Sequence, residues 1–222
     1  MNYSPEKNKI CAIVPFYNEE KTLPEILERI SGYVDLIIAV NDGSTDNSAA
    51  YAENFEKVIL LNHAENSGKG TALKTGFEKS IELETSVTVT IDADGQHEPE
   101  LIPEFIEKIK TYDIVIGNRL HDMKSMPVQR RASNLITSKL LSLKTGLKIL
   151  DSQSGYRAYR TNILRKIMPS FNGFEAESEI LVKAARNNLK VGFINIPTVY
   201  GNDNSKMRPL QAILGFIKTI MS

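Results

Sequence analysis

Short apolar runs alternate along the chain with longer segments in which apolar residues recur every three or four positions. The runs are rich in β-branched residues and too short for helices, which predicts strands at residues 10–16, 36–40, 58–61, 87–91 and 114–116. The amphipathic segments between them predict helices at about residues 21–33, 46–55, 69–83 and 99–110. Strands that alternate with helices are typical of an α/β fold, with a mostly parallel central sheet and helices on both faces.

Polar residues follow three of the predicted strands at the point where each strand ends. They occupy residues 15–20, 41–46 and 92–97. Any one of these segments is also typical of a turn or of a helix cap. In open parallel sheets, however, ligands bind outside the carboxyl ends of the strands. Three polar segments at one edge of the sheet therefore favour a binding site there.

Asp92 and Asp94 are the most informative pair within these segments. Two carboxylates one residue apart after a strand can hold a hard divalent cation, and Mg²⁺ commonly takes one or two carboxylates together with substrate phosphates. Such a cation would neutralise a diphosphate leaving group. The glycine-rich residues 67–71 do not form a Walker A loop, because His63 stands where that loop needs its first glycine.

The length of 222 residues suits one sizeable α/β domain, within which the charges are unevenly divided. Residues 1–111 hold 10 Lys and Arg against 20 Asp and Glu, whereas residues 112–222 hold 17 against 7, so the net charge of the whole chain is zero. Residues 119–148 contain seven basic residues and one acidic residue, Asp122. This local excess predicts binding to phosphate or to an anionic surface, and mutual attraction of the two halves is the alternative.

Several classes of protein are excluded or disfavoured by the composition. No run approaches the roughly 18 apolar residues of a membrane-spanning helix. The first residues lack the pattern of a secretory signal, so we expect a cytoplasmic protein. The single cysteine, Cys11, excludes a disulfide framework and a cysteine-based zinc cluster, and we expect it to be a small buried side chain.

Six motifs follow one another along nearly the whole chain. They are VPFYNEEKTLPEIL, VNDGSTDNS, NSGKGTALKTGF, IDADGQHEPELIPEF, GNRL and DSQSGYRAYR. In this order they resemble the family 2 glycosyltransferases, and the chain is most similar to the dolichyl- or polyprenyl-phosphate mannosyl- and glucosyltransferases of that family. The resemblance implies a GT-A nucleotide-diphospho-sugar transferase fold in one domain, 1–222. Its nucleotide-sugar half would be 1–118, and its acceptor half, 119–222, would end in an amphipathic helix.

The resemblance also assigns roles to individual residues. Those implied to bind the nucleotide sugar are Pro15, Tyr17, Asn18, Glu19, Asp42, Lys69, Asp92, Ala93, Asp94 and Gln96. A divalent metal, Mg²⁺ or Mn²⁺, is implied at Asp92, Asp94 and Gln96, with Asp94 the most expected direct ligand. Those implied to bind the acceptor or its phosphate are Arg119, Arg130, Arg131, Asp151, Gln153, Arg157 and Lys206. The catalytic candidates are Asp94, Arg119, Arg131 and Glu177.

The implied reaction is an inverting, single-displacement transfer of a hexose from GDP-mannose or UDP-glucose to a polyprenyl or dolichyl phosphate. A phosphate monoester is already anionic at neutral pH, so it needs positioning by basic residues more than deprotonation. With a saccharide or another alcohol as acceptor, Glu177 or Asp151 would instead act as the base. A haloacid-dehalogenase-like phosphatase and a non-catalytic scaffold are the remaining alternatives. We expect no nucleic acid partner, and the sequence does not predict the oligomeric state.

Two segments indicate how a lipid acceptor would be reached. Residues 135–150 interleave leucines with lysines, and residues 209–222 place apolar residues on one helical face, with Lys206, Arg208 and Lys218 nearby. Both patterns are typical of peripheral contact, here at the cytoplasmic face of a membrane. Packing on the core or in a dimer interface is the alternative for both segments.

Overall fold

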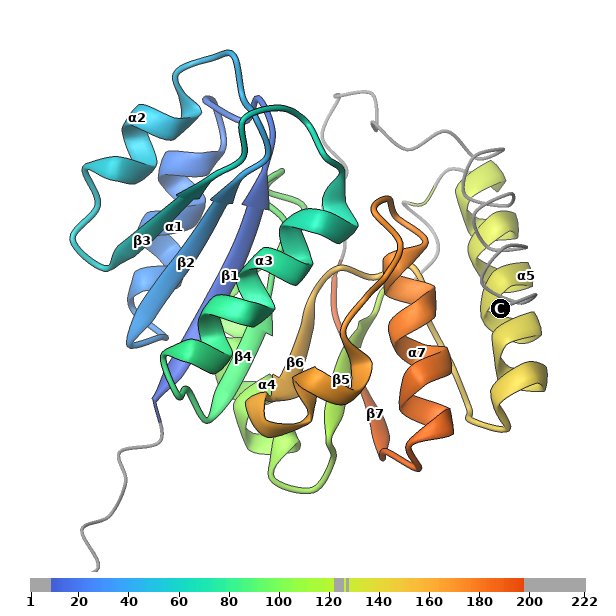
Figure 1. Cartoon of the computed structure of the whole chain (residues 1–222). Helices are drawn as coiled ribbons and strands as arrows, with labels where there is room; N and C mark the ends of the chain where they lie inside the picture. The colour runs from blue at the N-terminus through green and yellow to red at the C-terminus, as the bar shows by residue number, and fades with distance from the viewer. Residues whose placement is uncertain (1–8, 122–125, 127, 198–222) are drawn as a thin grey trace, which may run out of the picture.

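The described residues form one seven-stranded sheet (Figure 1). The structure is a computed structural model, and it describes residues 9–121, 126 and 128–197. The strands are β1 (Ile10–Phe16), β2 (Leu36–Asn41), β3 (Val58–Asn62), β4 (Val87–Thr90), β5 (Ile114–Asn118), β6 (Arg157–Arg160) and β7 (Val191–Asn195). They lie in the order β3-β2-β1-β4-β6-β5-β7, and all neighbours are parallel except that β6 is antiparallel to β4 and β5. The predicted mostly parallel sheet is therefore confirmed.

Helices cover both faces of this sheet, as predicted. Along the chain they are α1 (Leu23–Ser31), α2 (Ser48–Glu53), α3 (Lys69–Glu82), α4 (Ile102–Ile109), α5 (Val128–Thr145), α6 (Leu164–Ile167) and α7 (Ala176–Arg186), with short 3-10 turns η1 (Pro99–Leu101) before α4 and η2 (Thr161–Ile163) before α6. The core on one face includes side chains of α1, α2 and α4. The core on the other face includes side chains of α3, α6 and α7, and α5 lies beside α7 at the rim of the molecule (Figure 1).

Strand β1 shows how the sequence specifies two cores. Ala12 and Val14 belong to the core that contains side chains of α1 and α4, whereas Cys11 and Ile13 belong to the core that contains side chains of α3 and α7. This follows from the alternation of side chains between the two faces of a strand. All four side chains are fully buried, which confirms the expected burial of Cys11.

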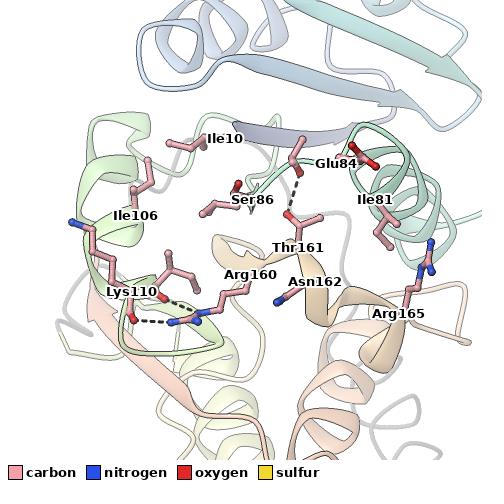
Figure 2. Close-up of a pocket in the computed structure, with 13 residues that line it drawn as sticks. Ile10, Ile81, Glu84, Ser86, Ile106, Lys110, Arg160, Thr161, Asn162 and Arg165 are labelled. Carbon is pink, nitrogen blue, oxygen red and sulfur yellow. Dashed lines mark hydrogen bonds between the residues drawn. The ribbon is translucent and has the colours of Figure 1, made fainter. Parts of the chain in front are cut away.

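A hollow of about 830 Å³ lies at the amino ends of β1 and β4 (Figure 2). Ile10, Ile81 and Ile106 form part of its apolar wall. Arg160 also lines the hollow, but its guanidinium group donates hydrogen bonds to three backbone carbonyl oxygens at and just beyond the end of α4. None of the residues with a predicted function lines this hollow, so the candidate site lies at the opposite edge of the sheet.

Candidate active site

A half-buried lysine joins distant parts of the chain at the carboxyl edge of the sheet. Lys69, at the start of α3, places its Nζ atom 2.7 Å from Asp92 Oδ1 and 2.7 Å from Glu177 Oε1. Asp92 follows β4, and Glu177 lies in the first turn of α7. We call these three residues the Lys69 triad. Lys69 and Asp92 were expected to bind the nucleotide sugar and Glu177 was a catalytic candidate, and in the structure Lys69 pairs with both carboxylates.

Within the Lys69 triad, Lys69 and Asp92 are charged at neutral pH. Burial alone would lower the pKa of Lys69, but the carboxylates of Asp92 and Glu177 outweigh it and raise that pKa above its usual value. Burial alone would raise the pKa of Asp92, but the Lys69 ammonium group holds it below its usual range. Because a buried charge without its partner is costly, the triad also ties α3, β4 and α7 together.

Gly155 lies where the Lys69 triad meets the turn before β6. A Cβ atom at this position would lie 2.5 Å from Asp92 Oδ2 and 2.7 Å from Lys69 Nζ. We expect Gly155→Ala to displace the ion pair and to lower the free energy of unfolding by about 1–3 kcal/mol, measured by urea denaturation. Gly32→Ala is the control, because its Cβ would meet its nearest neighbouring atom at 4.0 Å. Equal stability of the two variants would contradict the crowding at Gly155.

Asp94 has a different environment from Asp92. It lies at the solvent-exposed edge of the site, and its Oδ1 atom accepts a hydrogen bond from the Gln96 backbone N–H group at 3.0 Å. Partial withdrawal from water and the negative charge of Asp92 raise the pKa of Asp94 to about 6. A divalent cation bound there would remove this penalty, because it compensates both carboxylates.

The residues present fit a cation that binds together with a diphosphate. Within the described ranges, no three His, Cys, Asp or Glu side chains are grouped as a complete metal site. Asp92 already gives Oδ1 to Lys69, so Asp94 is the carboxylate of the pair that is open to solvent. One carboxylate is sufficient for Mg²⁺ when phosphate and water oxygens complete its coordination.

The raised pKa of Asp94 predicts a pH dependence for metal binding. The cation must displace the carboxyl proton, so its affinity should reach a plateau above about pH 6 and fall roughly tenfold per pH unit below it. Titration calorimetry with Mn²⁺ and a nucleoside diphosphate, repeated across this pH range, measures the effect. An affinity that stays constant below pH 6 would show that Asp94 does not bind the cation.

Hydrogen bonds join the loops that follow β1 and β2. Asn18 N donates to Ser44 Oγ at 3.0 Å, and Asn18 Oδ1 accepts from Thr45 N at 2.8 Å. Asn18 has a φ of 54°, a left-handed conformation that asparagine adopts more readily than most residues. Glu19 N donates to Ser48 Oγ at 2.8 Å. These bonds fix the shape of the edge at which the nucleotide is predicted to bind.

Asp42 holds a neighbouring loop with its carboxylate. Oδ1 accepts a hydrogen bond from Ser67 N and Oδ2 accepts one from Gly68 N, both at 2.9 Å. His63 Nδ1 lies 2.8 Å from Oδ1. The exposed fraction of Asp42 is 5%. The resemblance implied contacts with the nucleotide, whereas in the structure both oxygens of Asp42 fix the loop that leads into Lys69.

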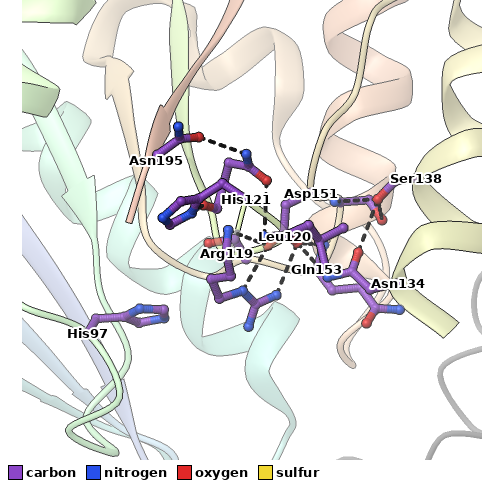
Figure 3. A network of polar contacts seen from close by, with 12 residues as sticks. His97, Arg119, Leu120, His121, Asn134, Ser138, Asp151, Gln153 and Asn195 are labelled. Carbon is purple, nitrogen blue, oxygen red and sulfur yellow. Dashed lines mark hydrogen bonds and ion pairs between the residues drawn. The ribbon is translucent and has the colours of Figure 1, made fainter. Parts of the chain in front are cut away.

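Arg119 and Asp151 form a second charged pair, beside α5 (Figure 3). Asp151 is fully buried and accepts hydrogen bonds from Arg119 Nε at 2.8 Å, Arg119 Nη2 at 3.0 Å and Asn134 Nδ2 at 2.8 Å. Gln153 N also donates to its Oδ1 atom. Burial alone would raise the pKa of Asp151, but Arg119 and these hydrogen bonds hold it below its usual range. Arg119 also helps to lower the pKa of Asp92.

Arg157 has a structural environment that its implied role did not anticipate. It begins β6, is 1% exposed, and donates hydrogen bonds to the backbone carbonyl oxygens of Ser152, Ser154 and Glu177. The implied contact with acceptor phosphate is therefore not supported by this arrangement. Arg157 instead holds the turn before β6 against the start of α7, and its motif indicated the arginine but not its burial.

The other predicted residues lie at the same edge or outside the described ranges. Half-buried positions on the nucleotide side are Pro15, Tyr17, Asn18, Glu19 and Gln96. Ala93 is buried beneath them, and Arg130 and Arg131 lie in the first turn of α5, half-buried and exposed respectively. Lys206 and the helix predicted at 209–222 lie outside the described residues.

Sequence reasoning gave no individual role to three residues of this site. Asn134 binds Asp151, as described above, from the inner face of α5. His97 is buried, its Nε2 atom lies 4.0 Å from Asp92 Oδ2, and burial lowers its pKa to about 4, so it is neutral. Phe174 is 38% exposed, and its ring centre lies 5.7 Å from Lys69 Nζ. The nearness of His97 to Asp92 in the sequence was the one available signal.

Comparisons with known proteins show the family to which the chain is similar. The model of the family described as Glycosyl transferase family 2 matches residues 11–168. The UDP-N-acetylglucosamine-dolichyl-phosphate N-acetylglucosaminyltransferase of Methanococcus voltae is 33% identical over 231 residues, which cover 93% of this chain and 92% of that protein. The undecaprenyl-phosphate mannosyltransferase of Micrococcus luteus is 33% identical over 168 residues, which cover 72% of this chain and 69% of that protein.

Solved structures share the fold. Glucosyl-3-phosphoglycerate synthase from Mycobacterium tuberculosis, in complex with Mn²⁺, uridine diphosphate and phosphoglyceric acid, matches with a TM-score of 0.76 at 19% identity. The match covers 96% of this chain and 78% of that chain. This likeness confirms the expected GT-A fold.

Proposed function

The chain belongs to glycosyl transferase family 2, and we propose that it moves a hexose from a nucleoside-diphosphate sugar to a polyprenyl or dolichyl phosphate. Relatives named for transfer to dolichyl phosphate and to undecaprenyl phosphate support this acceptor class. Because the chain is a glycosyltransferase, the phosphatase and the non-catalytic scaffold are excluded as alternatives. Within the single domain, we assign donor binding to residues 1–118 and acceptor binding to residues 119–222.

The observation that supports a phosphate acceptor is that both candidate bases, Asp151 and Glu177, are buried and paired with basic residues. Asp151 is fully buried, paired with Arg119, and has a lowered pKa. The Glu177 side chain is 4% exposed and is paired with Lys69. Neither carboxylate is arranged to take a proton from an alcohol. A phosphate acceptor brings its own negative charge, so it needs basic residues and no base.

We assign the divalent cation to Asp94 and the donor diphosphate, with Asp92 and Gln96 beside them. The solved structure with Mn²⁺ and uridine diphosphate supports metal use in this fold. When bound, the cation neutralises the departing nucleoside diphosphate. Lys69 orients Asp92, and Arg119, held by Asp151, supplies positive charge on the acceptor side of the same site.

Arg131→Ala is expected to impair use of the acceptor more than binding of the donor. Arg131 is exposed in the first turn of α5, in the acceptor half. Loss of one charge-assisted phosphate contact should raise the acceptor KM about tenfold, while the Kd of the nucleotide sugar stays unchanged. Steady-state kinetics and calorimetry separate the two effects. Arg165→Ala, exposed at the opposite edge of the sheet, is the control, and an equal loss on both sides would refute this role of Arg131.

A thermal-shift panel tests the donor half of the proposal. UDP-glucose, UDP-N-acetylglucosamine, GDP-mannose, UDP and GDP are compared with Mg²⁺ or Mn²⁺ and again with a chelator. Binding to the native state raises Tm by mass action, so we expect a shift with the ligands of one base and loss of that shift with the chelator. No shift with any of these ligands would contradict donor binding, and a shift that survives the chelator would contradict the metal.

A further inference from the structure

Phe174 is an exposed aromatic residue beside the Lys69 triad. It lies in the segment before α7, is 38% exposed, and its ring centre lies 5.7 Å from Lys69 Nζ. The other aromatic side chains among the exposed large apolar residues of the described ranges, Tyr33 and Tyr51, lie just after α1 and on α2. An apolar ring left in water beside charged groups is typical of a site that binds a ligand with both apolar and polar surfaces.

The segment between α6 and α7, which carries Phe174, is anchored to two helices. Glu179, in α7, accepts a hydrogen bond from Phe171 N at 3.0 Å. At the start of α3, Gly70 N donates a hydrogen bond to Asn172 O at 2.7 Å. This contact requires the glycine, because a Cβ atom at position 70 would collide with Phe171 O. Since the segment is anchored on both sides, the ring loses little conformational freedom when a ligand covers it.

The contacts of Lys69 place this ring beside the reacting end of the donor. Lys69 Nζ lies 2.7 Å from Asp92 Oδ1. Asp94, the residue assigned to the cation and the donor diphosphate, follows Asp92 two positions later. The hexose of the donor is bonded directly to that diphosphate. Groups around Lys69 are therefore within reach of the sugar ring, whereas the nucleoside is assigned to the loops after β1 and β2.

A hexose matches the mixture of groups at this point. A pyranose ring exposes C–H bonds on its faces, which pack against an aromatic ring, and hydroxyl groups around its rim, which need hydrogen-bond partners. The side chain of Asp92 is 24% exposed, so its carboxylate is accessible to such a hydroxyl group. A prenyl chain would pack on the ring but has no hydroxyl group for this carboxylate, and the nucleotide base is assigned to another part of the edge.

We propose that Phe174 stacks on one face of the transferred hexose and determines how tightly the sugar part of the donor binds. This inference rests on the proposed function for the class of donor. The Lys69 ammonium group lies within the range of a cation–π contact with the ring and so helps to fix its orientation. Loss of the ring should therefore weaken binding of the nucleotide sugar and leave binding of the nucleoside diphosphate unchanged.

Calorimetry in the presence of Mn²⁺ tests this difference. UDP-glucose is compared with UDP, and GDP-mannose with GDP. Phe174→Ala should raise the Kd of the bound nucleotide sugar about tenfold, with the Kd of the corresponding diphosphate and the Tm unchanged. Phe174→Leu, which keeps an apolar side chain without a ring, should behave like Phe174→Ala, whereas Phe174→Tyr should bind like the wild type. Tyr51→Ala, at an exposed position on α2, is the matched control and should bind both ligands normally.

Fluorescence gives a second readout, because the chain contains no tryptophan. Phe174→Trp introduces a single reporter at the position of the ring. Its emission should change when the nucleotide sugar is added and change much less with the nucleoside diphosphate. Tyr51→Trp places the same reporter on α2, and its emission should respond to neither ligand.

Three results would overturn the stacking. An equal loss of affinity for the nucleotide sugar and the diphosphate in Phe174→Ala would indicate a structural role or contact with the base. Wild-type binding by Phe174→Leu would show that the ring is not required. A rise in the KM of polyprenyl phosphate with an unchanged Kd of the donor would indicate contact with the prenyl chain.

The same experiments separate the stacking from the proposed function. A sugar-specific loss of affinity in Phe174→Ala, in a chain that transfers nothing to polyprenyl phosphate, would refute the proposed acceptor and support the stacking. Failure of the wild type to bind any nucleotide sugar would overturn both.

Discussion

Replacing Asp94 with asparagine is expected to reduce sugar transfer about a thousandfold or more without unfolding the chain. The cation held by Asp94 would stabilise the charge that develops on the departing diphosphate, and losing several kcal/mol of such stabilisation corresponds to this factor. Asp94 is exposed and accepts a hydrogen bond from the Gln96 backbone N–H group, so we expect the fold not to depend on its charge.

The assay is single-turnover transfer at saturating donor, accompanied by the thermal unfolding of both proteins. Asparagine is similar in size and keeps an oxygen that can accept the hydrogen bond from Gln96, so a change in activity reports the lost charge. Glu53→Gln, at an exposed position on α2, is the control and should be fully active. Wild-type turnover by the Asp94→Asn variant, or by the native chain with its metal chelated, would contradict the assigned role of Asp94.

Replacing Lys69 with methionine is expected to cost about 3–5 kcal/mol of unfolding free energy and to abolish transfer. Methionine keeps most of the volume but leaves Asp92 and Glu177 facing each other without a cation. Because like charges that are buried and unpaired are expensive, part of the loss should return when Glu177→Gln is added to the variant.

Urea denaturation of the single and double variants measures these changes in the free energy of unfolding. Lys79→Met lies on the same helix and removes an exposed ion pair with Glu82, which should cost less than about 1 kcal/mol. A Lys69→Met variant as stable as Lys79→Met, or no recovery on adding Glu177→Gln, would show that the triad does not stabilise the site as described.

The strands and helices of the first half were predicted from the sequence because their hydrophobic periods are regular. Strands β1 to β5 and helices α1 to α4 lie where the pattern placed them, with differences at the ends, such as β4 ending at Thr90. Strand β6 has four residues, too few for an alternation to be recognised, and it lies inside the motif that ends at Arg160. No strand was therefore predicted at these residues, where the structure has an antiparallel strand.

The sequence predicted the location of the candidate site more completely than it predicted the roles of the individual residues. Parallel strands explain why the segments containing Asp42 and Asp92 reach one edge of the sheet. The partner of each side chain depends on tertiary contacts that no local pattern contains. Asp42 holds backbone N–H groups of the loop before Lys69, and Arg157 holds backbone carbonyl groups. A motif predicts the residue type at a position. Burial determines whether the charged group of that residue binds a ligand or other groups of the protein.

The sequence likewise did not predict which side of helix α5 faces the protein. The leucines and lysines of residues 135–150 were recognised as an amphipathic pattern, but the pattern is compatible with either side of the helix facing the protein. The orientation is set by Asp151, since a buried carboxylate requires hydrogen-bond donors such as Asn134 on the side of α5 that packs inward.

The most direct test of the proposed activity is transfer of a radiolabelled hexose from its nucleoside-diphosphate donor to a lipid, followed by organic extraction. Polyprenyl phosphate and the matching polyprenol are compared as acceptors, each with Mn²⁺ and with a chelator. We expect labelled lipid with polyprenyl phosphate and Mn²⁺, and none with the polyprenol. Equal labelling of the polyprenol would contradict the phosphate acceptor, because it would require a base that neither Asp151 nor Glu177 is arranged to supply.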